Sequence, residues 1–496
     1  MKDQERCGAA RRIYKGESLR TRRQFLKTAA FATASAVTPF PYYHSSLAML
    51  SKFQSRRPPA SERKFVSQTV EHTIAEIKAA VADAELAWLF ENCFPNTLDT
   101  TIRFSEKNGK PDTFVITGDI PAMWLRDSTA QVWPYLRLVQ DDKALRLLLA
   151  GIINRQTQCI LIDPYANAFN DGPGDSYWKT DLTDMKPELH ERKWEIDSLC
   201  YPIRLAYGYW KTTGDVSCFE DDWRRAMSLV VKTFKEQQRF EGRGPYKFQR
   251  NTPVWSDTVP MGGYGNPTRS NGMIHSMFRP SDDSCVFPFL VPSNLFAATA
   301  LAHLAEISVT VWRDEKFAVE CRKLSEQIKT VVAKYAVVAH PTAGRIYAYE
   351  IDGFGNVLFM DDANIPSLLA LPYLGCCAVD DAVYQNTRRF VLSENNPYFH
   401  RGKAAEGVGS PHAGLGMIWP LAIIVRVLTS QNDDEILHCL KMLKATHAGT
   451  GFMHEAFEQD DPQKFTRTWF AWANTLFGEM ILKLHAERPH LLKSKF

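Results

Sequence analysis

The sequence predicts an all-α protein, and three observations support that fold class. Apolar residues recur at helical spacing in eleven segments between residues 73 and 485. Only two short stretches, residues 113–116 and 346–350, have the composition of strands. No low-complexity linker interrupts the chain after residue 60, so residues 61–496 form one predicted domain. Eleven to thirteen helices in one domain favour a closed toroid of helix pairs, the (α/α)6 barrel, and an irregular all-α domain is the alternative.

The helices are predicted from the spacing of their apolar residues. The first segment, residues 73–94, carries Ile74, Ile77, Val81, Leu86 and Leu89 three to five residues apart, near helical spacing. Residues 143–157 repeat the pattern with leucine and isoleucine. The other helices are expected at residues 195–210, 221–238, 293–307, 316–337, 365–374, 381–392, 412–428, 435–445 and 469–485. They fall loosely into pairs, and the loops between them carry the polar motifs.

Residues 1–60 are predicted to lie outside the fold, as an export signal followed by a disordered linker. The string RRQFLK at residues 22–27 resembles the twin-arginine export signal of bacteria. The uncharged stretch at residues 28–48 is too polar and too interrupted by proline to span a membrane. We therefore expect a periplasmic or extracellular protein whose mature form has no membrane span, and a basic disordered tail is the alternative.

Charge and cysteine content exclude several classes of protein. Residues 1–64 contain 14 Lys/Arg and 4 Asp/Glu, a net charge of +10, so the overall charge of +3 leaves −7 on the remainder. An acidic body of this kind argues against nucleic acid as a partner. The ten cysteines show neither a CxxC pair nor zinc-ligand spacing, and most are expected to be small, buried core residues. The number of disulfides stays open, and a monomer is expected.

The loops contain many carboxylates beside aromatic residues and glycines. These candidates are Asp119, Asp127, Asp163, Asp282, Asp283, Asp361, Asp362 and Glu455. A metal site is one interpretation, but the loops lack both the alternating calcium pattern and the HExxH zinc motif. A sugar site is the other, because glycoside hydrolysis needs one carboxylic acid and one carboxylate, with further polar groups for the hydroxyls. No metal or other cofactor is therefore expected.

Several motifs resemble glycoside hydrolase family 125, the exo-acting α-1,6-mannosidases of bacteria and fungi. They are GDIPAMWLRDSTAQV, IDPYANAFN, FRPSDDSC, MDDANIPSLL, GVGSPH and TRTWFAWANTLFGE, which occur in one order over roughly residues 65–488. The resemblance implies an (α/α)6 fold and a metal-independent, inverting hydrolysis of terminal, non-reducing α-1,6-linked mannose. It also implies that Asp282 in RPSDDSC is the general acid, with Asp283 as the fallback. Glu455 in GFMHEAF is then the general base.

Six further residues are predicted to bind the sugar. Arg126 and Asp127 would form a paired floor of the pocket, with Trp124 packed beside them. The alternative for the Arg126–Asp127 pair is a structural ion pair at a helix start. Asp362 and Asn364 could bind hydroxyls or cap the helix predicted at residue 365. His412 follows Ser410 and Pro411 and opens a predicted helix, and it could bind substrate or be a loop histidine with its hydrogen bonds satisfied.

Other functions remain open from the residues alone. Asp163 is interpreted as a turn or wall residue, and Trp469 and Trp472 as core residues, although the neighbouring Arg467 could reach the pocket. The expected partner is a mannose-containing oligosaccharide or glycan. A hydrolase of the same fold with a preference for another terminal sugar or linkage is one rival, and a non-catalytic carbohydrate-binding protein with a decayed site is the other.

Overall fold

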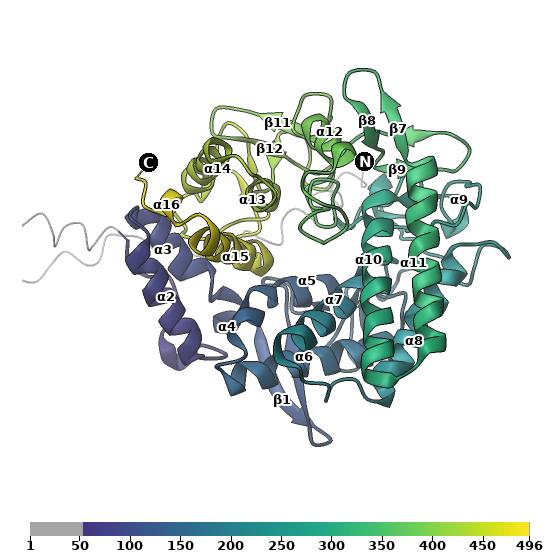
Figure 1. Cartoon of the computed structure of the whole chain (residues 1–496), viewed down its shortest axis with the longest axis horizontal. Helices are drawn as coiled ribbons and strands as arrows, with labels where there is room; N and C mark the ends of the chain where they lie inside the picture. The colour runs from purple at the N-terminus through teal and green to yellow at the C-terminus, as the bar shows by residue number, and fades with distance from the viewer. Residues whose placement is uncertain (1–52, 496) are drawn as a thin grey trace, which may run out of the picture. The chain divides into compact units, whose positions relative to one another are not determined.

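The computed structural model describes residues 53–495, and within them the helices form two layers around a ring (Figure 1). The inner layer contains α5 (Leu125–Ala130), α7 (Ile196–Thr213), α10 (Val291–Ile307), α13 (Pro420–Leu428) and α15 (Ala471–Glu487). The outer layer contains α3 (Ala84–Cys93), α6 (Lys143–Ile162), α8 (Asp221–Gln237), α11 (Glu315–Tyr335), α12 (Ala382–Val391) and α14 (Asp433–Thr446). Inner neighbours pack as α5 on α7, α7 on α10, α13 on α15 and α15 on α5. The predicted (α/α)6 fold is confirmed.

Apolar patterning explains which helices lie inside. Helix α10 buries side chains on all sides, whereas α8 buries a single stripe that includes Trp223, Val230 and Phe234. A helix that is apolar all round belongs in the interior of a domain, and an amphipathic one belongs at its surface. The helical run Val291–Trp312 is also long and apolar enough to span a membrane by composition. Because α10 lies in the inner layer, its apolar side chains are buried in the protein core.

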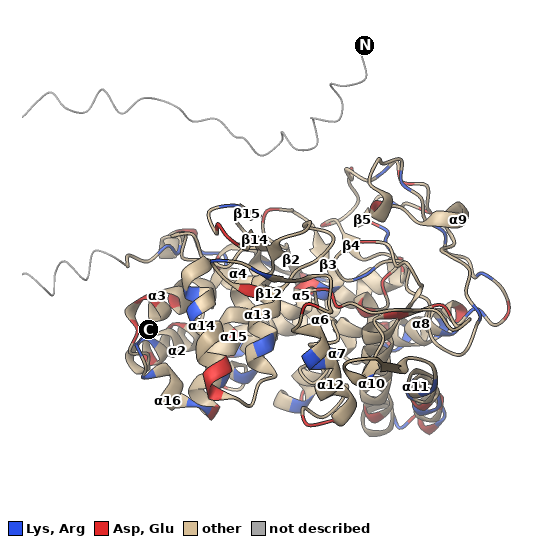
Figure 2. Cartoon of the chain, turned by 90° about the horizontal axis from the view of Figure 1, so that it is seen from above, with Lys and Arg blue, Asp and Glu red and all other residues tan. Residues whose placement is uncertain are grey.

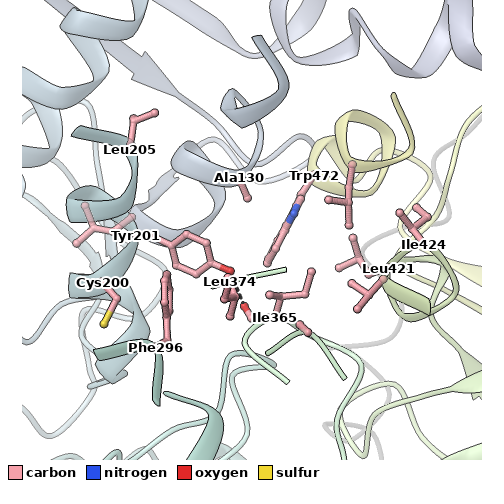
Figure 3. Close-up of a cluster of buried hydrophobic side chains, with 14 of the residues drawn as sticks. Ala130, Cys200, Tyr201, Leu205, Phe296, Ile365, Leu374, Leu421, Ile424 and Trp472 are labelled. Carbon is pink, nitrogen blue, oxygen red and sulfur yellow. Dashed lines mark hydrogen bonds between the residues drawn. The ribbon is translucent and has the colours of Figure 1, made fainter. Parts of the chain in front are cut away.

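The sixth inner position is filled by residues 365–374, where the helix prediction was wrong. This segment consists of bends and turns. Pro372 would stand inside the predicted helix, where it has no N–H to donate and its ring clashes with the preceding turn. Its residues still close the ring: Figure 3 shows Ile365 and Leu374 amid side chains of α7, α10, α13 and α15. The hydroxyl of Tyr201 in α7 donates a hydrogen bond to the carbonyl of Ile365 at 3.0 Å.

Two other predicted helices differ from the structure. The expected helix at residues 73–94 is two helices, α2 (Gln68–Ala80) and α3, separated where Asp83 accepts hydrogen bonds from the first N–H groups of α3. The expected helix at residues 412–428 begins only at Pro420, because Gly414 and Gly416 before it adopt positive φ angles. His412 therefore lies in a loop and does not open a helix.

Short sheets precede the inner helices. Three three-stranded sheets contain β3 (Met123–Trp124), β4 (Ala168–Phe169) and β5 (Leu189–Glu191); β6 (Phe289–Leu290), β9 (Glu350–Ile351) and β10 (Val357–Leu358); and β13 (Met417–Ile418), β14 (Ala456–Glu458) and β15 (Phe465–Thr466). In each of them the strands pair antiparallel. Figure 2 shows β4, β5, β14 and β15 on one side of the helices. The sheets thus gather polar loops at the N-terminal ends of the inner helices.

The remaining elements connect the layers. Antiparallel hairpins are β1 (Ile102–Lys107) with β2 (Lys110–Val115), β7 (Val337–His340) with β8 (Gly344–Tyr347), and β11 (Phe399–Arg401) with β12 (Glu406–Val408). Short helices are η1 (Ala60–Glu62), α4 (Asn96–Thr100), η2 (Trp133–Leu138), η3 (Trp255–Asp257), α9 (Pro260–Gly263), the π-helical turn η4 (Ser308–Trp312) and α16 (Pro489–Leu492). The nine cysteines within residues 53–495 are free thiols, and seven of them are buried.

The compact unit begins at Phe53, earlier than the predicted boundary at residue 61. The guanidinium of Arg57 donates to the carboxylates of Glu71 and Asp99, at 2.9 Å and 2.8 Å. The indole Nε1 of Trp88 donates to the carbonyl of Gln54 at 2.7 Å. Residues 53–60 are therefore part of the fold, and the linker prediction for them was wrong. The export motif at residues 22–27 lies outside the described residues.

Candidate active site

A cavity lies where the segments that precede the inner helices converge. Its volume is about 40 Å³, well below the roughly 300–1,000 Å³ typical of small-molecule sites. The lining residues are Thr117, Ile120, Trp124, Arg126, Asp127, Ser281, Asp282, Asn364, His412, Trp419, Glu455, Arg467 and Phe470. Seven of the nine residues predicted for the site belong to this set. Asp283 and Asp362 are the two that lie behind the wall.

The floor of the cavity is a buried ion cluster around Arg126. Its Nη1 donates to the carboxylates of Glu195 at 2.6 Å and Asp197 at 2.9 Å, whereas its Nε lies 3.7 Å from Asp127. The predicted pairing of Arg126 with Asp127 is thus secondary. Burial raises the pKa of Glu195, against the attraction of Arg126, and the carboxylate of Asp282 raises it further.

Sequence reasoning missed Glu195 and Asp197. Both stand at the start of α7. Acidic residues are common there because the positive end of the helix dipole stabilises their negative charge. Nothing in the KWEID string at residues 193–197 distinguishes that general role from a pairing with Arg126, 69 residues earlier in the chain. Only the fold brings the two segments together.

Asp127 is a second buried carboxylate in the cavity wall. Burial raises its pKa to about 6, although the guanidinium groups of Arg126 and Arg467 oppose the shift. The carboxylate of Asp282 adds a smaller upward effect. Asp127 therefore changes its charge within the pH range in which many hydrolases work.

Asp282 reaches the cavity from a tight loop before β6. Its backbone φ of +71° is unusual for a residue with a side chain. Its side chain is 29% exposed, and its Oδ1 lies 3.9 Å from Nη2 of Arg126. Among the described residues this Oδ1 has no hydrogen-bond partner. That oxygen is itself buried, so the exposed part of the Asp282 side chain is what lines the cavity.

Asp283 occupies a different environment from its neighbour. Its side chain is almost fully buried, and one carboxylate oxygen lies 3.5 Å from Nδ1 of His412. Although burial opposes protonation of His412, the carboxylates of Asp283, Glu455 and Asp282 raise its pKa to about 9. The imidazole stays 40% exposed at the cavity, so water weakens these interactions. Asp283 thus holds His412, while Asp282 faces the cavity.

Glu455 lies in the wall formed by β14 and β15. Its two carboxylate oxygens accept hydrogen bonds from Oγ1 of Thr466 at 3.0 Å and from Nη1 of Arg467 at 3.4 Å. Arg467 is anchored in turn by Asp119, to which its Nε donates at 2.9 Å. The cation beside Glu455 is Arg467, since burial lowers the pKa of His454 to about 4. These contacts fix the position of the Glu455 carboxylate.

Asp362 supports the wall from behind and does not line it. Its carboxylate is fully buried and accepts hydrogen bonds from the hydroxyls of Ser281 at 2.7 Å and Ser410 at 3.1 Å. The prediction that Asp362 contacts sugar hydroxyls directly is therefore corrected to a supporting role. Asn364 lines the cavity, and its amide donates to the carbonyl of Pro280 at 2.8 Å.

The remaining predictions concern residues around the cavity. Trp124 lines it and packs edge-on against His190, with ring centroids 5.3 Å apart. Trp472 is a core residue as predicted, whereas Trp469 precedes α15 and is partly exposed. Asp163 accepts hydrogen bonds from the backbone N–H of Tyr165 and from Arg192, which confirms its role in a turn.

A two-layered ring of helices, in which residues 365–374 fill the sixth inner position and an acidic cavity lies at one end of the inner helices, is the architecture of a class of glycoside hydrolases. The profile of the family described as metal-independent alpha-mannosidase (GH125) matches residues 83–482. The Meiotically up-regulated gene 157 protein of Schizosaccharomyces pombe strain 972 is 43% identical over 459 residues, 88% of this chain and 90% of that protein. The chain belongs to family GH125, the metal-independent α-mannosidases, and is a glycoside hydrolase.

Solved structures agree with this assignment. A metal-independent α-mannosidase from Streptococcus pneumoniae, in a non-productive complex with α-1,6-mannobiose, is 42% identical with a TM-score of 0.82. The match covers 86% of this chain and 100% of that one. A bacterial glucoamylase in complex with acarbose is 12% identical with a TM-score of 0.52, over 84% of this chain and 58% of that one. At that identity the likeness concerns the fold alone.

Proposed function

We propose that the chain is an exo-acting, inverting α-1,6-mannosidase, which removes terminal non-reducing mannose from oligosaccharides or glycans. The observation that carries the proposal is the pair of carboxyl groups, Asp282 and Glu455, in one cavity but in different surroundings. Glu455 is held by Arg467 and Thr466, which suits a base. The side chain of Asp282 lines the cavity and is 29% exposed, which suits an acid that must contact the leaving oxygen.

In the proposed reaction Asp282 is the general acid and Glu455 the general base. The carboxyl proton of Asp282 passes to the glycosidic oxygen as the bond between that oxygen and C1 breaks. Glu455 takes a proton from a water molecule, whose oxygen bonds to C1 from the opposite face of the ring. The products are β-mannose and the shortened glycan alcohol. Asp283 is the less suitable acid, because His412 already occupies its carboxylate.

The remaining wall residues are proposed to bind the mannose that is released. The Trp124 ring offers a flat apolar surface, which suits a sugar face. Arg126, Asp127, Asn364 and His412 offer donors and acceptors for hydroxyl groups. The preference for the α-1,6 linkage is proposed from the relative of Streptococcus pneumoniae, whose complex contains α-1,6-mannobiose.

Export is a separate part of the proposal. The RRQFLK string supports transport of the folded chain by the twin-arginine route, with a periplasmic or extracellular enzyme as the result. Free, buried cysteines suit a protein that folds before export. We propose a monomer whose partner is a mannose-containing glycan.

Proton NMR of the purified protein with α-1,6-mannobiose tests the function directly. We expect β-mannose to appear first, with much slower hydrolysis of the 1,2- and 1,3-linked isomers. Initial release of α-mannose would rule out inversion. Preference for another isomer would show a different linkage specificity.

Replacement of the base tests the assignment of Glu455. We expect Glu455→Gln to lower kcat on mannobiose by about 10²–10⁴-fold, the range that a general base contributes. Mannobiose binding, followed by isothermal titration calorimetry, should persist because the amide keeps the shape of the side chain. Full activity of this variant would remove Glu455 from the mechanism.

A further inference from the structure

We propose that Lys193 is a positioning residue for the general acid Asp282. The inference rests on the proposed acid role of Asp282. Lys193 is not among the residues that line the cavity and is almost fully buried, with 3% of its side chain exposed. Its Nζ donates a hydrogen bond to the backbone carbonyl of Asp282 at 2.8 Å. The contact therefore fixes the main chain of the acid and leaves its carboxyl group free.

The conformation of Asp282 explains why an anchor is needed. Its φ of +71° lies in the left-handed region, which residues other than glycine seldom occupy. The N–H of Asp282 bonds to the carbonyl of Arg279 at 2.9 Å, and the N–H of Arg279 bonds to the carbonyl of Asp283 at 2.7 Å. These bonds close the turn on itself. The Lys193 ammonium ties that turn to the rest of the wall.

Lys193 is itself held in place by charged neighbours. Its Nζ donates to the carboxylate of Asp257 at 2.8 Å and lies 3.5 Å from that of Glu191. Arg250 donates to the same two carboxylates, at 2.8 Å each. Asp181 completes the cluster through Arg250. A lysine that is paired and buried in this way has lost most of its rotamer freedom, so it can hold the carbonyl of Asp282 at a fixed point.

The segment that carries Lys193 also binds the acid loop through its backbone. The carbonyl of Trp194 accepts hydrogen bonds from the N–H groups of Met277 and Phe278, at 3.2 Å and 3.1 Å. The Lys193 ammonium lies 4.9 Å from the centre of the Phe278 ring. Two residues further on, Glu195 binds Arg126 in the floor. The segment 193–195 thus fixes the positions of Arg126 in the cavity floor and of Asp282 relative to each other.

The test compares two substrates that differ in their need for an acid. The mannose leaving group of α-1,6-mannobiose must be protonated, whereas fluoride leaves α-mannosyl fluoride with little help. We expect Lys193→Met to lower kcat/KM for mannobiose by about 10–100-fold, as expected for a misplacement of about 1 Å. For α-mannosyl fluoride it should change by less than about threefold, because the sugar pocket and the base remain. Lys193→Arg, which keeps a donor, should lie between Lys193→Met and wild type on mannobiose.

Lys186→Met is the matched control. Lys186 likewise donates to a backbone carbonyl, that of Ile162 at 2.6 Å, and lies 3.5 Å from the carboxylate of Asp163. It does not line the cavity, so this variant should hydrolyse both substrates as the wild type does. Circular dichroism and the melting temperature report whether each variant is folded. If Lys193→Met does not fold, Asp257→Asn weakens the hold on the ammonium and should show the same substrate difference, reduced in size.

Equal losses on both substrates, or no loss at all, would overturn the positioning role of Lys193. Failure of the acid assignment gives a different result. We expect Asp282→Asn to lose mannobiose hydrolysis and keep most of its activity on the fluoride. If Asp282→Asn loses neither or both, Asp282 is not the acid, whatever Lys193→Met shows.

Discussion

The carboxyl group of Asp127 is placed where its negative charge weakens the fold. Burial raises its pKa from 3.8 to about 6, so the folded protein holds this proton more tightly than the unfolded chain does. As the pH rises from about 4 to about 6, the unfolded chain loses the proton first and stability falls. The loss is complete above about pH 6, where Asp127 is ionised in both states. Such a loss of stability is common at binding sites, where a buried charge is kept because it interacts with the ligand.

We therefore predict that Asp127→Asn stabilises the protein at pH 7.5. The gain should be about 1–3 kcal/mol, because the net upward shift of about two pKa units, which already includes the opposing attraction of Arg126, corresponds to at most roughly 3 kcal/mol. Urea denaturation measures it, and the gain should shrink at pH 4, where both proteins are neutral at this position. Asp175→Asn, which alters an exposed carboxylate, is the control and should show no such pH dependence. A gain that is equal at both pH values would contradict the prediction.

Elements differ in how far the sequence predicts them. Long helices such as α8 and α11 follow directly from apolar spacing and end within two residues of their predicted bounds. The segment at residues 365–374 has the apolar residues of a helix because it occupies the place of one, but Pro372 inside it disfavours the helix. Apolar content reports burial, and backbone hydrogen bonding decides the conformation.

The sixth inner segment depends on one carboxylate for its backbone bonds. Asp361 is fully buried, and its two oxygens accept hydrogen bonds from the N–H groups of Leu368 at 2.8 Å and Leu369 at 3.0 Å. Residues 361–367 are not helical, so no preceding helical turn offers carbonyl groups to these two N–H groups. The side chain thus replaces the carbonyls that a preceding turn would supply, although burial raises its pKa to about 8.

We predict that Asp361→Ala destabilises the protein by about 2–4 kcal/mol, since it leaves two buried N–H groups without an acceptor. Asp381→Ala offers a matched comparison, because Asp381 caps the outer helix α12 by accepting from the N–H of Tyr384 at 2.8 Å. Loss of a single helix cap of this kind should cost only about 1 kcal/mol. The midpoints of urea denaturation give both values. An equal or smaller cost for Asp361→Ala would show that the segment does not rely on this carboxylate.

At the scale of the whole molecule, the site is assembled by contacts between distant parts of the chain. Arg467 binds Asp119, 348 residues earlier, and Lys193 binds the carbonyl of Asp282, 89 residues later. Motifs identify the residues that carry charge or an aromatic ring, and seven predicted residues do line the cavity. The partners that hold them, such as Glu195 for Arg126, have no local signal, because the ring closure alone decides which loops meet.

The same closure involves residues 53–60, which the sequence assigned to a linker. Arg57 is buried and binds both Glu71 in α2 and Asp99 in α4, and only 2% of the Asp99 side chain is exposed. Removal of Arg57 would leave Asp99 near a single cation, Arg63, at 3.7 Å in the described chain. A buried charge that loses its partner costs far more than the pair contributes.

We predict that Arg57→Met lowers the free energy of unfolding by about 3–5 kcal/mol, the usual cost when one partner of a buried pair is removed. A chain shortened to begin at residue 61 should be at least as unstable, compared with one that begins at residue 53. The double variant Arg57→Met with Asp99→Asn should regain part of the loss, because the unpaired charge is gone. Urea denaturation of the four proteins measures these differences. If the double variant is as unstable as Arg57→Met alone, packing of the Arg57 stem, and not the charge on Asp99, is the reason that residues 53–60 belong to the domain.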